Sequence, residues 1–135
     1  MAARLRLSAT RLARQLRQEA GAGLSPSQMS ALAAIANNGP ITLGALAEYE
    51  RVAPPSVTKV VGKLEAAGLV RRTHDPGDRR VALASTTPAG DALLAKARQR
   101  KNVWLAHRLD ALSQDQRARL AAALDVLDAL TRDPE

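Results

Sequence analysis

Hydrophobic and polar residues recur along most of this chain with the period of an α-helix. Between Pro55 and Ala67 the apolar residues fall on one stripe about 100° wide, and the polar residues face the opposite side. A proline suits the first helical position, and Gly68 suits the residue just past the end. The pattern therefore predicts a short helix, polar and basic on one face, whose buried face consists of Val57, Val60, Val61 and Leu64.

Three further helices are predicted before this one. Residues 2–20 carry an apolar stripe opposite several arginines, and a glycine-rich segment follows them. Ser25-Pro26-Ser27-Gln28 combines a capping box with a proline at the first helical position, so a second helix begins there. It stops at Asn37-Asn38-Gly39-Pro40, where turn-forming residues accumulate, and Ile41 suits a short strand bridge. Thr42 then caps a third helix, whose predicted inward residues are Leu43, Leu46 and Ala47.

The last third of the chain predicts two more helices. Thr87-Pro88 opens a long helix from about Ala89 to Leu112, with predicted inward positions at Leu94, Ala97, Trp104, Leu105 and Leu109. Ser113-Gln114-Asp115-Gln116 is another capping box. It begins a final helix in which leucine recurs at helical spacing, at positions 120, 124, 127 and 130.

The middle of the chain predicts a winged helix. Only Glu50-Arg51-Val52-Ala53 separates two short helices, and the apolar residues around it have helix-turn-helix spacing: Leu46, Ala47, Val52, Val57, Val61 and Leu64. Two predicted strands follow, Leu69 to Thr73 and Arg79 to Ser85, around the turn-forming run from His74 to Asp78. In the second strand Val81 and Leu83 share one face, while Ala82 and Ala84 are small enough for either. The expected fold class is mostly α with a small β-hairpin wing.

Composition limits the class of protein. The chain has 135 residues, which predicts one domain, and its 46% hydrophobic content is rich in Ala, with one Trp, one Tyr and no Phe. Such a core has little volume, so we expect further burial through oligomerisation. The absence of Cys excludes disulfides and thiolate catalysis. No apolar run approaches the roughly 18 residues of a membrane span, and the Arg-rich start lacks an apolar signal core, so a cytoplasmic location without membrane association is expected.

Charge is segregated along the chain. The formal net charge is +7 and the pI is about 11.0. Residues 51–80 carry seven basic and three acidic side chains, a net of +4, whereas residues 109–135 carry three basic and six acidic ones, a net of −3. A basic winged-helix segment favours a polyanionic partner.

Four motifs carry a resemblance to a known family. They are Ser56-Val57-Thr58-Lys59, the run from Lys63 to Val70, Asp75-Pro76-Gly77-Asp78-Arg79-Arg80, and Thr87-Pro88-Ala89-Gly90. In this order and spacing the chain resembles the MarR family of bacterial winged-helix regulators over nearly its whole length. Three positions depart from the family pattern: Lys59 stands where Arg is common, Gly62 lies on the outward helix face, and Thr86 replaces the usual Leu.

The resemblance implies a particular assembly and mode of action. It implies an obligate homodimer, built from helices at about residues 2–20 and 88–131, with the winged helix at about 25–86. The partner would be double-stranded DNA with a pseudo-palindromic operator. The resemblance also implies a small-molecule pocket between the dimerisation helices and the winged helix, often occupied by phenolic or other aromatic acids.

Residues of the predicted recognition helix are the first candidates for DNA contact. Ser56, Thr58 and Lys59 lie in its first turns, the part that normally reaches base edges. Lys63 lies further along, where contact with phosphate is expected. The alternative for this set is an ordinary solvated helix face, and Gly62 either permits close backbone approach to DNA or is neutral.

The wing supplies a second set of candidates. Arg80 resembles the family's minor-groove arginine, and Asp78 resembles the carboxylate that holds it in place; the alternative is a surface ion pair with no role in DNA binding. Arg79, Arg71 and Arg72 are expected to contact the DNA backbone, with Thr42 and Arg51 as weaker candidates for the same role.

Other chemistry is weakly represented. Trp104 and Tyr49 are candidates for an effector pocket, or else core or dimer residues. His74 and His107 are too isolated to suggest a metal site, no cofactor is expected, and the lack of a nucleophile–base pair or phosphate loop argues against an enzyme. We therefore predict a homodimeric, sequence-specific DNA-binding repressor, released by a small-molecule effector. The alternatives are a ligand-insensitive repressor, a non-specific DNA-binding protein, and a winged-helix module for a protein partner.

Overall fold

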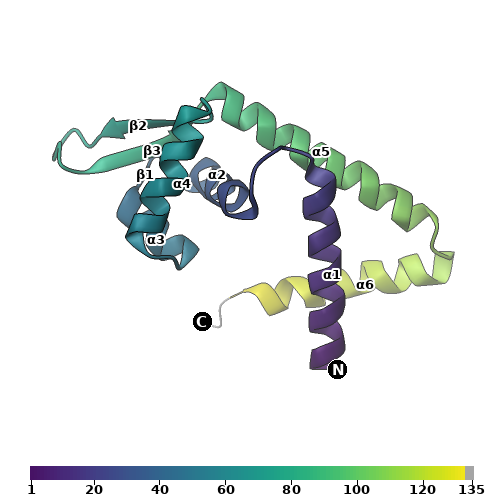
Figure 1. Ribbon diagram of the computed structural model, residues 1–135. Helices are drawn as coiled ribbons and strands as arrows, with labels where there is room; N and C mark the ends of the chain where they lie inside the picture. The colour runs from purple at the N-terminus through teal and green to yellow at the C-terminus, as the bar shows by residue number, and fades with distance from the viewer. Residues whose placement is uncertain (133–135) are drawn as a thin grey trace. The chain divides into compact units, whose positions relative to one another are not determined.

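The computed structural model describes residues 1–132 and confirms a mostly helical fold with a small antiparallel sheet (Figure 1). The chain forms two compact units, residues 1–101 and the residues from 102 onward, with the boundary inside the fifth helix. In chain order the elements are α1 (Ala2–Ala20), α2 (Pro26–Asn38), β1 (Ile41–Thr42), α3 (Leu43–Glu50), α4 (Pro54–Ala66), β2 (Val70–His74), β3 (Ala82–Thr86), α5 (Pro88–Asp110) and α6 (Gln114–Thr131).

The predicted helix caps are present. The Ser25 hydroxyl accepts a hydrogen bond from the Gln28 amide at the start of α2, and Gln28 returns a bond to the Ser25 amide. Ser113 and Gln116 form the same box at the start of α6, and the Thr42 hydroxyl accepts from the amide of Ala45. These bonds satisfy amides that have no partner within the helix, which explains why each helix begins where the sequence predicts.

The core of the first unit lies between α2, α3, α4 and the sheet. Its most completely buried side chains are Leu32, Ile35, Leu46, Val61 and Leu64. The buried face predicted for α4 is confirmed, because Val57 is also buried and Val60 packs half-buried against the core. Val52, which belongs to the helix-turn-helix spacing, lies in the α3–α4 turn and is 46% exposed, so it is not part of the core.

The three strands pair in the order β1-β3-β2, all antiparallel, and the hairpin extends beyond the helices (Figure 1). The prediction that the second strand begins at Arg79 is wrong. The strand begins at Ala82, because Val81 and Asp78 still belong to the turn, where the Val81 amide donates to the Asp78 carbonyl at 3.0 Å. The buried residue of β3 is Ala84, opposite Ile41 of β1, whereas Val81 and Leu83 are half-buried.

The start of α5 is anchored to the turn between α4 and β2. The Thr87 hydroxyl donates to the Gly68 carbonyl at 2.6 Å and accepts from the Gly90 amide, and the Thr87 amide donates to the Leu69 carbonyl. A Cβ on Gly90 would overlap the Leu69 carbonyl oxygen and lie 3.1 Å from its carbon. The Thr-Pro-Ala-Gly motif therefore joins α5 to the winged helix, with glycine required by the close approach of two backbones.

Many apolar side chains outside this core remain exposed. Leu94 and Ala97 of α5 are buried as predicted, but Trp104, Leu105 and Leu109 in the second unit are only half-buried. Their prediction as inward residues is thus only partly met: within residues 102–132 the second unit consists of the end of α5 and of α6. Exposed leucines also line α1 and α6, namely Leu5, Leu7, Leu12, Leu120, Leu124, Leu127 and Leu130. Within residues 1–132, no helix combines the length and the apolar character needed to cross a membrane.

Candidate nucleic-acid interface

The outward face of α4 carries the predicted recognition residues. Ser56, Thr58, Lys59 and Lys63 are all exposed, opposite the buried valines. The helix begins one residue earlier than predicted, with Pro54 and Pro55 in its first turn and no side-chain cap from Ala53. Two prolines suit this position because they lack the amides that a cap would otherwise satisfy. The start of α4 therefore has no capping side chain, and Ser56 is exposed there.

Arg72 lies against α4 and not on the open side of the wing. It shares one face of β2 with buried Val70, and its guanidinium Nη2 lies 3.5 Å from the Glu65 carboxylate. The same nitrogen would lie 3.9 Å from a Cβ on Gly62. The Arg72 side chain is 31% exposed, so it is less available for phosphate contact than predicted. Arg71, on the opposite face of β2, is exposed.

The tip of the wing orders one arginine. Asp78 accepts three hydrogen bonds from Arg80: from its Nε at 3.1 Å, from its Nη2 at 3.2 Å and from its backbone amide at 3.1 Å. The Arg80 side chain is 91% exposed, so this fork directs a guanidinium into solvent from a turn also braced by Asp75, which accepts from the Gly77 amide. The predicted pairing of Asp78 with Arg80 is present.

The same contacts favour the ionised form of Asp78. Hydrogen bonds from the Arg80 side chain and then from its amide lower the pKa of Asp78 below 3.8. A carboxyl group whose pKa is lowered in the folded state contributes to folding stability at pH values above its unfolded pKa. This contribution is lost as the pH falls through the folded pKa. The Asp78 carboxylate is therefore ionised at neutral pH, in the form that accepts the hydrogen bonds of Arg80.

The weaker candidates differ in their surroundings. Arg79 is exposed beside Arg80 in the turn, and Thr42 is half-buried, with its hydroxyl already accepting from the Ala45 amide. Arg51 ends α3 in the left-handed region, with φ 54°, and its amide donates back to the Glu48 carbonyl. A non-glycine residue in this conformation is strained. The exposed guanidinium of Arg51 thus stands on a backbone position that would suit glycine better.

Replacement of Arg51 by glycine is expected to move stability and DNA affinity in opposite directions. Relief of the left-handed strain should raise the free energy of unfolding by about 1 kcal/mol. Loss of the cation should lower DNA affinity several-fold if Arg51 contacts phosphate. Urea denaturation and fluorescence anisotropy with labelled duplex measure the two effects. Unchanged DNA affinity in a stabilised variant would remove Arg51 from the interface.

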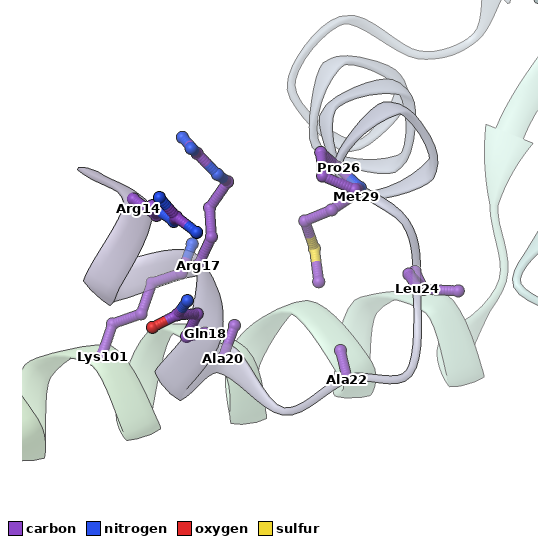
Figure 2. A pocket seen from close by; sticks show the side chains of 9 residues that line it. All are labelled: Arg14, Arg17, Gln18, Ala20, Ala22, Leu24, Pro26, Met29 and Lys101. Atoms are coloured by element: carbon purple, nitrogen blue, oxygen red, sulfur yellow. The ribbon is translucent and has the colours of Figure 1, made fainter. Parts of the chain in front are cut away.

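A pocket, which we call the α1–α5 pocket, lies between α1, α2 and the first-unit part of α5, in the region where the family resemblance implies one, but its lining residues were not named from the sequence. It encloses about 330 Å³. Figure 2 shows Arg17, Gln18 and Lys101 gathered on one side of it, with Met29 of α2 on the other. The remaining lining residues are Arg14, Ala20, Ala22, Leu24 and Pro26. The sequence signal for these residues was the arginine face of residues 2–20, and Lys101 is brought to it only by the packing of α5.

One further contact holds this pocket's walls together. Arg100 of α5 donates from Nη1 to the carbonyl of Gly21 at 3.0 Å and to that of Ala20 at 3.3 Å. A cation is favourable at the end of a helix, where carbonyls lack intrahelical partners. Arg100 thereby fixes the end of α1 against α5.

The two effector candidates named from sequence lie elsewhere. Tyr49 on α3 is 59% exposed, and neither it nor Trp104 lines the pocket described above. The Arg108 guanidinium instead lies over the Trp104 ring, with its Cζ 5.1 Å from the ring centroid. This is a cation–π contact within the second unit. Among the described residues there is no group of three or more His, Asp or Glu side chains positioned to hold a metal ion.

Comparison with known proteins identifies the family. The MarR family model matches residues 24–82, which span α2 to the start of β3. An uncharacterized HTH-type transcriptional regulator of Mycobacterium bovis, Mb0904, is 43% identical over 131 residues, covering 96% of this chain and 92% of that protein. The chain belongs to the MarR family. It is a DNA-binding transcriptional regulator and not an enzyme, as the sequence predicted.

Solved structures of MarR-type regulators have the same fold. A crystal structure of a proposed transcriptional regulator from Pseudomonas aeruginosa PA01 matches 98% of this chain and 94% of its own, with a TM-score of 0.88 and 33% identity. Streptococcus pneumoniae FabT, solved in complex with DNA, matches 96% of both chains with a TM-score of 0.72 and 18% identity. The second likeness concerns the fold alone.

Proposed function

We propose that this MarR-family regulator is a cytoplasmic homodimer that represses transcription by occupying a pseudo-palindromic operator. The observation that carries the proposal is the pairing of an exposed polar face on α4 with an exposed, Asp78-ordered Arg80 on the adjacent wing. A helix of this length fits the major groove, and an arginine at a wing tip suits a narrow minor groove. A dimer bound across a promoter excludes other proteins from the same DNA.

Different residues serve different parts of this contact. Ser56, Thr58 and Lys59, in the first turns of α4, are the residues we expect to meet base edges, although the Thr58 hydroxyl donates to the Pro54 carbonyl at 3.2 Å in the free protein. Lys63 and Arg79 supply charge to the phosphates, which positions the protein without reading sequence. Lys59 is a compact point charge, so it discriminates guanine less strictly than a bidentate arginine would.

Exposed apolar surface supports the proposed dimer. Leu5 and Leu12 on α1 and Leu124 and Leu130 on α6 are all exposed in the single chain. Residues 2–20 carry five arginines and one acidic residue, whereas residues 109–135 have a net charge of −3. Helices of opposite charge with exposed leucines favour association between copies of the chain. Residues 2–20 and 88–131 would then serve dimerisation, with the winged helix at 25–86 reading DNA at half-sites about 10 base pairs apart.

The α1–α5 pocket is the proposed effector site. Arg14, Arg17 and Lys101 supply positive charge, while Met29 and Leu24 supply apolar surface. This combination suits an aromatic or other amphipathic organic anion. Its walls belong to α1, α2 and α5, so an occupant that prefers one arrangement of these helices shifts the dimer toward that arrangement. DNA is released in proportion to the difference between the occupant's affinities for the two arrangements of the dimer.

Footprinting on the DNA upstream of the protein's own gene tests the proposed function. We expect protection of a two-fold symmetric site, and loss of most of the affinity when that site is scrambled. Lys63→Ala should weaken binding to both sequences alike and reduce the salt slope by about one, while Lys59→Ala should weaken mainly the symmetric site. Equal affinity for the native and scrambled DNA would indicate a non-specific DNA-binding protein.

A further inference from the structure

A second pocket lies inside the helix-turn-helix itself. It encloses about 320 Å³ between the start of α2, the α3–α4 turn and the first turns of α4. Its floor is apolar, formed by Ala31, Leu46 and Val57, and the exposed side chain of Val52 lies at its edge. We call this the turn pocket. Its size falls at the lower end of the range that small-molecule sites occupy, about 300 to 1,000 Å³.

The one charged residue among those that line the turn pocket is acidic. Glu50 at the end of α3 is half-buried, and its Oε2 accepts a hydrogen bond from the Ser30 hydroxyl at 2.6 Å. This bond from α2 fixes the orientation of the carboxylate. Within residues 1–132 the structure gives the other oxygen, Oε1, no hydrogen-bond partner. An oriented carboxylate with a free acceptor beside apolar surface is a recognition element for a cation.

We propose that the turn pocket binds a small organic cation with an apolar body, of the arylalkylamine class. The ammonium group would donate to Glu50, and the apolar body would cover Val52, Val57 and Val60. An organic anion is disfavoured here by repulsion from the carboxylate and is better accommodated by the cations of the α1–α5 pocket. The two pockets therefore select ligands of opposite charge.

Occupancy of the turn pocket would oppose DNA binding. Ser56 lines this pocket and also stands in the first turn of the proposed DNA-reading face. A ligand seated against Ser56 and Val60 lies between α2 and α4, so it competes with the approach of that turn to the major groove. This second part of the proposal rests on the proposed DNA-binding function, whereas binding of the cation does not.

Three probes with one apolar body and different head groups test the proposal. They are 4-phenylbutylamine, 4-phenylbutyrate and 4-phenylbutan-1-ol, titrated into the full-length protein by calorimetry. We expect the amine to bind more tightly than the alcohol, and Glu50→Gln to weaken amine binding about tenfold or more, since a bond to a charged group is lost. The glutamine oxygen still accepts from Ser30, so the fold is preserved. Glu48→Gln, at an exposed site two residues away, is the matched control and should leave amine binding unchanged.

The alternative outcomes separate the proposals. Amine binding that survives Glu50→Gln, or that Glu48→Gln weakens equally, would overturn the turn pocket as a cation site. Phenylbutyrate is expected to lose affinity on Arg17→Gln and not on Glu50→Gln. In fluorescence anisotropy with the operator duplex, the amine should weaken DNA binding by the wild type and not by Glu50→Gln. If the amine binds in a Glu50-dependent way but does not weaken DNA binding, the proposed competition between the amine and DNA is overturned. Failure of the wild type to bind any duplex would overturn the proposed function and leave the calorimetric result standing.

Discussion

Replacing Gly90 with alanine is expected to lower the free energy of unfolding by about 3 kcal/mol or more. The added methyl group would overlap the Leu69 carbonyl and reach 3.4 Å from Leu32 Cδ1 in the core. The Leu69 backbone cannot move freely, because its carbonyl accepts from the Thr87 amide and its own amide donates to Leu64. Relief therefore requires a shift of the whole start of α5 away from the winged helix. Overpacking between backbones costs more than overpacking against flexible side chains.

Gly44→Ala is the matched control for Gly90→Ala. Gly44 lies inside α3, and a Cβ there would meet no atom within 4 Å. Alanine in an open helical position is expected to raise stability by up to about 1 kcal/mol. Urea denaturation followed by circular dichroism measures both variants, and the two midpoints should move in opposite directions. Equal midpoints would contradict the packing of α5 on Leu69.

Arg80→Ala is expected to weaken operator binding by about 10- to 100-fold while leaving stability nearly unchanged. The guanidinium is 91% exposed, so its ion pair with Asp78 contributes little to folding. Its expected contribution is to DNA, where a well-placed arginine is worth about 1 to 3 kcal/mol. Asp78→Asn should give a smaller loss of affinity. The side-chain oxygen of asparagine still accepts a hydrogen bond from Arg80, but the second carboxylate oxygen, which accepts from the other guanidinium nitrogen, is replaced by an NH₂ group. Fluorescence anisotropy with the operator duplex measures these changes.

Arg119→Ala controls for charge and for loss of an ion pair. Arg119 on α6 makes an exposed pair with Asp115 at 3.0 Å, comparable to the 3.1 Å between Arg80 and Asp78. Removing it changes the net charge equally, outside the proposed interface. We expect operator affinity within about twofold of the wild type for Arg119→Ala at physiological salt, because distant charges are screened. A loss as large as that of Arg80→Ala would assign the effect to overall charge and not to the wing.

Much of the local structure was predictable from short segments. The capping residues Ser25, Thr42 and Ser113 stand at the helix starts that their sequences predict. The alternation of buried and polar positions in α4 also matched the structure. These features depend on hydrogen bonds and periodicity within a few residues, so the sequence contains nearly all the information that determines them. The pairing of Asp78 with Arg80 is local in the same sense.

Features that join distant segments were not predictable in this way. Val52 is exposed because of the path of the α3–α4 turn, and Arg72 lies against Glu65 because β2 turns that face toward α4. The first pocket needs Lys101 beside Arg17, and the second needs Glu50 held by Ser30, pairs separated by 84 and 20 residues in the sequence. The motif containing Gly90 was visible in the sequence, but the contact that excludes a side chain there was not.

The sequence by itself thus determined the helices, their caps, the winged-helix order and the family. Tertiary structure alone decided which side chains line the two pockets, and that Arg72 lies against Glu65 while Arg71 remains exposed. The physical reason is the range of the forces involved. Capping and amphipathic periodicity act within one element, whereas pockets and close backbone contacts depend on how separate elements pack.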